Sequence, residues 1–126
     1  MPDSASERAR LEQDAELDPE DDKLVILARS ARARNQAAEG AAVRDTDGRT
    51  YAATTVRLPS FALTALQAAV AAAVSSGAEN LEAAAIVTDE PLFDQASVHA
   101  VRDLAEKAPI YRADPSGAVR EVLRQS

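Results

Sequence analysis

The stretch GAAVRDTDGRTY, residues 40–51, decides the local structure at the centre of the chain. Within it, Asp47-Gly48 is the dipeptide that most strongly indicates a tight β-hairpin turn. Residues 41–45 and 50–56 flank this turn and are expected to be its two strands. The sequence therefore predicts a hairpin here, and the other elements follow outward from it on both sides.

A helix is expected before the hairpin, over residues 23–38. Asp21 or Asp22 supplies the N-cap, since a carboxylate accepts hydrogen bonds from the free N–H groups of a first turn. Gly40 is expected to end the helix. The apolar positions that follow helical spacing and should face the core are Leu24, Leu27, Ala28 and Ala31.

Pro59 breaks the pattern after the hairpin, and Ser60 is expected to cap a second helix from residue 61 or 62 to residue 76, with Gly77 at its C-terminal end. The following segments are expected to be a buried strand (83–88), a helix (95–107), a strand (108–112), a turn (114–117) and a short terminal helix (119–124). This alternation of helices and strands predicts an α/β protein, a three-layer α/β/α sandwich.

The composition excludes several kinds of site. The 126 residues include no cysteine, which excludes disulfides, thiol nucleophiles and thiolate metal sites. The chain has one histidine, His99. A net charge of −7 and 3% aromatic residues argue against nucleic-acid binding. The N-terminus lacks the pattern of a signal peptide, and no segment predicts a membrane span. We expect a cytoplasmic protein.

The net charge lies in the N-terminal segment. Residues 1–22 carry nine acids and two arginines, which accounts for the whole net charge of −7. Such a polar segment buries too little apolar surface to offset the entropy of ordering it. The sequence therefore predicts an acidic arm over residues 1–21 and a folded domain over residues 22–126. The arm is either a solubilising tail or a docking segment for a basic protein partner.

Several short motifs resemble those of the small cytidine deaminases. Residues 40–51 are similar to that family's V-G-A-A-L-x-x-x-D-G-x-x-Y hairpin, and SFALT (60–64) to its S-Y-G-L-T. AVSSG (73–77) is similar to A-V-S-E-G, AAAIV (83–87) to the A-I-A-V strand, and Arg102 to the arginine of C-x-x-C-R. The resemblance covers residues 23–113. It implies the deaminase sandwich around a mixed sheet and a homo-oligomer, either a dimer or a tetramer.

The residues that perform the family's chemistry are absent. In the family, cysteine or histidine ligands hold a zinc ion that activates water, and a glutamate moves the proton. The resemblance places Thr64 at the first ligand and Leu66 at the glutamate. A second alignment of the helix, shifted by two residues, places Leu66 and Ala68 there instead. Val98 and Val101 occupy the remaining ligand positions. Since valine has no lone pair, no zinc cofactor is expected.

The positions that resemble the family's substrate contacts have also changed. Thr55 and Arg57 stand where the family has the Asn and Glu that contact ribose, and Arg57 reverses the charge. Ala37 replaces a phenylalanine that packs on the base, and Glu39 replaces a valine. Thr55 and Arg57 are therefore only remnants of a substrate site, and the pocket has a different polarity.

Other groups of polar residues do not predict a site. Ser97, His99 and Asp103 suggest a catalytic triad, but residues two apart on a helix point to different sides. His99 and Asp103 alone do not make a selective metal site. The loop carboxylates are interpreted as solvated turn residues rather than ligands of a hard cation; they are Asp45, Asp47, Asp89, Glu90 and Asp94.

The sequence thus favours a cytidine deaminase-like protein that has lost catalysis and acts by binding or as a structural, interacting protein. Two alternatives stay open. One is a true cytidine or nucleoside deaminase, a hydrolase of cyclic amidines, whose ligands lie elsewhere. The other is a metal-free nucleoside-binding protein or enzyme that uses Thr55, Arg57 and Thr64.

Overall fold

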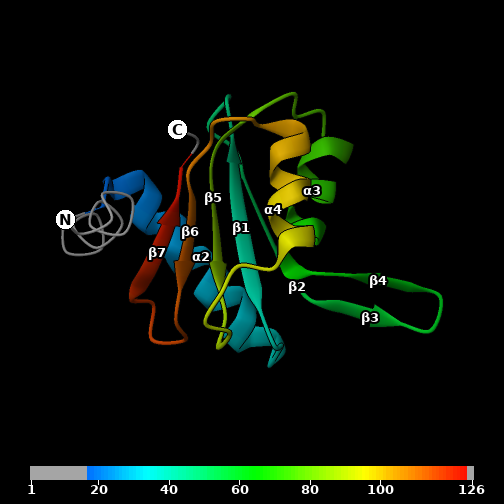
Figure 1. The fold of residues 1–126 in the computed structure, drawn as a ribbon. Helices are drawn as coiled ribbons and strands as arrows, with labels where there is room; N and C mark the ends of the chain where they lie inside the picture. Colours follow the sequence, from blue (N-terminus) through cyan, green and yellow to red (C-terminus); the bar gives the residue numbers. More distant parts are fainter. Residues whose placement is uncertain (1–16, 125–126) are drawn as a thin grey trace, which may run out of the picture.

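The structure, a computed structural model, describes residues 17–124. Most of the expected acidic arm, residues 1–16, lies outside the described residues. The chain forms a five-stranded mixed sheet in the order β2-β1-β5-β6-β7 (Figure 1). Helix α2 covers one face of the sheet, and helices α3 and α4 cover the other. This is the expected α/β/α sandwich.

The predicted hairpin forms the first two strands, β1 (Gly40–Asp45) and β2 (Thr50–Thr54), which pair antiparallel. Gly48 adopts a φ of 85° in the turn, a conformation that favours glycine. The carboxylate of Asp45 accepts hydrogen bonds from the Asp47 and Arg49 N–H groups, both at 2.9 Å, and from the Tyr51 hydroxyl. Asp45 therefore stabilises the turn.

Helix α2 (Pro19–Asn35) begins and ends earlier than the 23–38 expected. Asp18, rather than Asp21 or Asp22, is its N-cap and accepts a hydrogen bond from the Glu20 N–H at 2.9 Å. Proline is well suited to the first helical position because it has no N–H to leave unpaired. The helix ends at Gln36, which has a φ of 50°.

The packing of α2 on the sheet also differs from the prediction. Leu27 was expected in the core but is 37% exposed, and Val25 is buried there instead. Gly40 does not end the helix; it begins β1, directly beneath α2. A Cβ atom at Gly40 would lie 2.1 Å from the carbonyl oxygen of Ala28. Glycine at this position lets the helix approach the strand closely.

Asp21 anchors the first turn of α2 to the sheet. It is buried and accepts hydrogen bonds from Arg44 at 2.8 Å and from the Tyr111 hydroxyl. Burial, together with this hydrogen bond to Asp21, raises the pKa of Tyr111. Asp21, the last residue of the expected arm, is thus packed against the sheet.

The opposite face holds α3 (Ala65–Ser75) and α4 (Gln95–Leu104). The central strand β5 (Leu81–Val87) pairs antiparallel with β1 and parallel with β6 (Ile110–Ala113), so α4 connects two parallel neighbours. These elements match the expected order. Half of the buried residues of β5 are alanines, which lets the helices on both faces approach the sheet.

The second helix does not start at residue 61 or 62. Residues before it form a small separate hairpin, β3 (Val56–Leu58) and β4 (Phe61–Leu63), turning at Pro59-Ser60. The helix begins only at Ala65 because Thr64, not Ser60, supplies the cap. The hairpin projects from the body of the molecule (Figure 1).

The predicted terminal helix is wrong: β7 (Val119–Leu123) is an edge strand that pairs antiparallel with β6. The turn over residues 114–117, with Gly117 at a φ of 92°, returns the chain beside β6. Val122 then packs beneath α2 as part of the sheet. No helix within residues 17–124 is long and apolar enough to cross a membrane.

Candidate functional site

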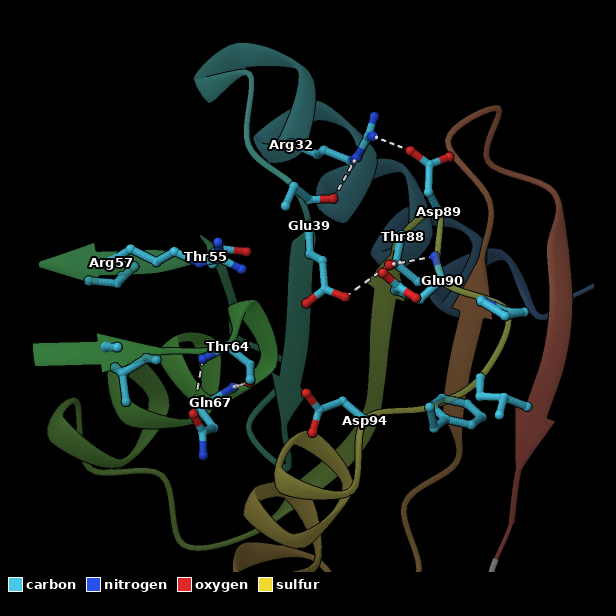
Figure 2. Close-up of a pocket in the computed structure, with 17 residues that line it drawn as sticks. Arg32, Glu39, Thr55, Arg57, Thr64, Gln67, Thr88, Asp89, Glu90 and Asp94 are labelled. Carbon is cyan, nitrogen blue, oxygen red and sulfur yellow. Dashed lines mark hydrogen bonds and ion pairs between the residues drawn. The ribbon is translucent and has the colours of Figure 1, made fainter.

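A cavity of about 730 Å³ lies where β1 begins and β5 ends, beside the N-terminus of α3 (Figure 2). Its walls come from Arg32 of α2, from residues 38–39 before β1, from residues 55–57 and 62–63 of the β3–β4 region, from the start of α3 and from residues 88–94 after β5. The hairpin runs directly into α3, whereas the other segments are distant in the sequence and are brought beside it by the sheet. A volume of this size accommodates a small organic molecule.

Thr64 caps α3 at the cavity wall. Its Oγ1 accepts a hydrogen bond from the Gln67 N–H at 3.1 Å, and the Gln67 side chain accepts one from the Thr64 N–H at 2.9 Å (Figure 2). This reciprocal pair satisfies two N–H groups at the helix start. Thr64 also accepts a 2.9 Å hydrogen bond from the hydroxyl of Ser97. Since Ser97 lies in the first turn of α4, the pair joins the N-terminal ends of both helices.

The other three positions that the resemblance assigns to catalysis lie in the core. Leu66 and Val101 are fully buried, and Val98 is 9% exposed. All three belong to one apolar cluster between the sheet and the two helices. Ala68, from the alternative alignment, offers only a methyl group. These side chains contribute packing rather than donor atoms.

The residues at these positions do not fit the zinc ion that the resemblance implies. Zinc in proteins takes thiolate, imidazole or carboxylate ligands. Thr64 offers a neutral hydroxyl that already accepts two hydrogen bonds, and valine offers no donor. Within residues 17–124, no group of three His, Cys, Asp or Glu side chains is arranged to hold a metal ion.

Thr55 and Arg57, the two positions that resemble substrate contacts, both line the cavity. The Oγ1 atom of Thr55 is buried and has no hydrogen-bond partner in the part of the chain that the structure describes. Arg57 extends along β3 at the cavity rim (Figure 2). The structure thus brings these two residues together with Thr64.

Arg32 lies on the other rim and is already paired. Its guanidinium donates to Asp89 at 3.2 Å and to the carbonyl of Ala38 at 3.1 Å. The loop of residues 88–94 is also held by β6. Arg112 of this strand donates to the carbonyl of Glu90 at 3.3 Å and lies over the ring of Phe93. These contacts fix the wall of the cavity.

Two carboxylates enter the cavity from opposite sides. Glu39, before β1, accepts a 2.9 Å hydrogen bond from Thr88, and Asp94 caps α4 by accepting one from the Ala96 N–H at 2.8 Å. Both carboxylates point toward the centre of the cavity (Figure 2). Neither forms an ion pair with a cation among residues 17–124.

Sequence reasoning placed Glu39 and Asp94 in a changed pocket and in a loop, but it did not bring them together. It also missed the hydrogen bond between Ser97 and Thr64. A buried serine among the apolar residues of a helix was the available signal, because such a hydroxyl needs a partner. Ser97, His99 and Asp103 form no triad, because Ser97 is 1% exposed while His99 and Asp103 lie on the exposed side of α4.

Arg102, the arginine of the C-x-x-C-R resemblance, does not line the cavity. It donates to the carbonyls of Ala105 at 3.1 Å and Ala108 at 2.8 Å, both just after α4. Burial lowers the pKa of Arg102. It therefore stabilises the end of the helix that carries Ser97.

The family model described as "cytidine deaminase-like" matches residues 17–117, which include the whole cavity. The chain belongs to the cytidine deaminase-like family. No curated protein matches the sequence.

Solved structures agree on the fold. The cytidine deaminase from Burkholderia pseudomallei is 23% identical with a TM-score of 0.70, covering 81% of this chain and 90% of its own. The cytidine deaminase from Mycobacterium leprae is 24% identical with a TM-score of 0.64, covering 82% and 94%. That from Mycobacterium tuberculosis is 23% identical with a TM-score of 0.62, covering 82% and 91%. At these identities the likeness establishes the fold.

Proposed function

We propose that this protein does not deaminate nucleosides and acts instead as a binding protein through the cavity beside α3. The proposal rests on the contacts that the residues make at the positions that the resemblance assigns to catalysis. Thr64 is committed to a helix cap and to Ser97, and the rest lie in the apolar core. At these positions no residue can bind a zinc ion that would activate water, and no residue can take the place of the glutamate that moves the proton.

The cavity supports binding as the retained role. It keeps a concave shape, apolar wall residues and several polar groups, which is the usual make-up of a small-molecule site. Its loop is fixed by hydrogen bonds from Arg32 and Arg112. A cavity with fixed walls costs less entropy to fill than one that must be ordered by its ligand.

The test is metal analysis combined with an activity assay. The full chain is purified, dialysed with added zinc, and then freed of unbound metal. We expect far less than one zinc per chain and no change in cytidine absorbance over hours at high protein concentration. Stoichiometric zinc together with loss of the cytidine band would overturn the proposal.

A second candidate is a metal-free nucleoside-binding protein. It is favoured by the position of Thr55 and Arg57 on the cavity wall, where the resemblance places ribose contacts. Cytidine or uridine would then raise the melting temperature of the wild-type chain. An Arg57→Ala variant should lose that rise, while Arg34→Ala, on the exposed side of α2, should keep it.

We also propose that the chain self-associates, and the projecting β3–β4 hairpin is the surface that supports this. Leu58 is 60% and Phe61 is 54% exposed, and the two residues pair across the hairpin. A two-stranded hairpin has little stability unless its apolar side is covered. Light scattering should give a mass above that of one chain.

The acidic arm is tested separately as a docking segment. The proteins that co-purify with the full chain are compared with those that co-purify with a chain lacking residues 1–22.

A further inference from the structure

We infer that the cavity beside α3 selects a small organic cation, an ammonium or amidinium group carried on an apolar body. This inference rests on the proposed binding function and adds the chemical class of the ligand. Glu39 and Asp94 carry the argument, because they enter the cavity from opposite walls and point toward its centre (Figure 2).

The charges that line the cavity favour a cation. Four carboxylates and two guanidinium groups line it, and one guanidinium, that of Arg32, is already paired with Asp89 at 3.2 Å. Glu39 receives only a neutral hydroxyl from Thr88, and Asp94 receives only a backbone N–H. Both carboxylates therefore keep acceptor capacity for a positively charged donor.

The remaining lining suits an organic ligand. Val56, Leu63 and Phe93 supply apolar wall on which an apolar ring can pack. Thr55 is also part of the wall, and its buried Oγ1 has no hydrogen-bond partner among the described residues. The carboxylates lie on separate walls and, in the described part of the chain, belong to no metal-holding group.

The inference differs from nucleoside binding in a measurable way. Cytidine is uncharged near neutral pH, so it gains nothing from an extra negative charge. A permanent cation gains a charge-assisted hydrogen bond at each carboxylate. The preference for charge over shape is therefore the property to measure.

Benzamidine and benzamide form a suitable pair of probes, since they have nearly the same shape and only the first is cationic at pH 7. Titration of the isotope-labelled full chain, followed by NMR at low salt, should move backbone signals of residues 88–94 with benzamidine. We expect benzamidine to bind at least about fivefold more tightly than benzamide. The preference should shrink as salt screens the charges.

Glu39→Gln and Asp94→Asn each remove one charge and keep the shape. The glutamine of the first variant can still accept from Thr88, and asparagine is a good helix cap, so both variants should stay folded. Each should lower the preference for benzamidine several-fold. Asp103→Asn and Glu106→Gln, which make the same changes outside the cavity, should leave it unchanged.

Equal affinity for the two probes, no binding of benzamidine, or variants without effect would overturn the inference. Binding of cytidine alone would overturn it too, yet would leave a non-deaminating binding protein in place. The proposed function fails only on the separate zinc and absorbance measurements, so the two failures are distinguishable.

Discussion

The hydroxyl of Thr64 makes two contacts at the wall of the cavity. It caps α3, and it accepts the hydrogen bond of a buried serine from α4. A metal ion bound by both helices would hold their N-terminal ends together. Here a neutral hydrogen bond between Ser97 and Thr64 makes that connection, so the two helices remain joined without a charged centre.

This arrangement predicts unequal costs for the two partners. Thr64→Val removes the cap and leaves the Ser97 hydroxyl buried without an acceptor, so it should lower the free energy of unfolding by about 2–3 kcal/mol. Ser97→Ala leaves Thr64 bonded to Gln67 and should cost only about 1 kcal/mol. Urea denaturation of both variants measures the difference.

The double variant and a surface control complete that test. Thr64→Val with Ser97→Ala should cost less than the sum of the single changes, because no hydroxyl is then left unpaired. Ser75→Ala, at the exposed end of α3, should change stability by less than about 0.5 kcal/mol. Equal costs for Thr64→Val and Ser97→Ala would contradict this account.

At the scale of single residues, the sequence shows which residues stand at the positions that the resemblance assigns to ligands, but not what these residues contact. The identity of Val98 and Val101 can be read directly from the chain. The contact between Ser97 and Thr64 joins residues 33 positions apart and depends on how two helices dock. Glu39 and Asp94 meet at one cavity for the same reason, which no local pattern shows.

At the scale of elements, local signals succeeded where the turn chemistry was decisive. Asp47-Gly48 predicted the central hairpin, and the run of small residues in 83–88 predicted the buried strand. The prediction of a helix over residues 119–124 was wrong because pairing with β6 decides the conformation of this segment. The extra hairpin before α3 was missed because Ser60 and Thr64 are both good caps, and Thr64 alone has Gln67 three residues later.

Gly40 provides a prediction about two elements. A Cβ there would lie 2.1 Å from the Ala28 carbonyl oxygen and 2.8 Å from the Arg32 backbone nitrogen. Since both contacts are with the backbone of α2, the whole helix would have to move. Gly40→Ala should therefore lower the free energy of unfolding by about 3 kcal/mol or more in thermal or urea melts.

Gly77→Ala is the matched control for that change. Gly77 has a φ of 100° and nothing within 4 Å of an added Cβ, so only backbone strain applies. Its cost should be about 1–2 kcal/mol. A Gly40→Ala protein as stable as Gly77→Ala would show that α2 lies further from β1 than the structure places it.

At the scale of the whole molecule, the chain has the cytidine deaminase-like fold, and apolar side chains pack between the sheet, α3 and α4. The sheet order depends on strands that contain none of the positions that the resemblance assigns to zinc ligands; those positions lie at the start of α3 and in α4. Leu66, Val98 and Val101 belong to this apolar cluster, so the core is dense at these positions. We expect the same scaffold to accept metal ligands there.

Restoring the donors tests that last point. Thr64→Cys combined with Val98→Cys and Val101→Cys places three thiolates where the scaffold would present them to one zinc ion. We expect close to one zinc per chain after purification with zinc, together with a higher melting temperature than the metal-free variant. Val98→Cys with Val101→Cys alone should bind zinc much more weakly.

Leu66→Cys in place of Thr64→Cys tests the alternative alignment, and stoichiometric zinc there would move the first ligand position two residues along α3. If neither triple variant binds zinc, the two helices do not present these positions to a common point, and the assignment of Thr64, Val98 and Val101 is wrong.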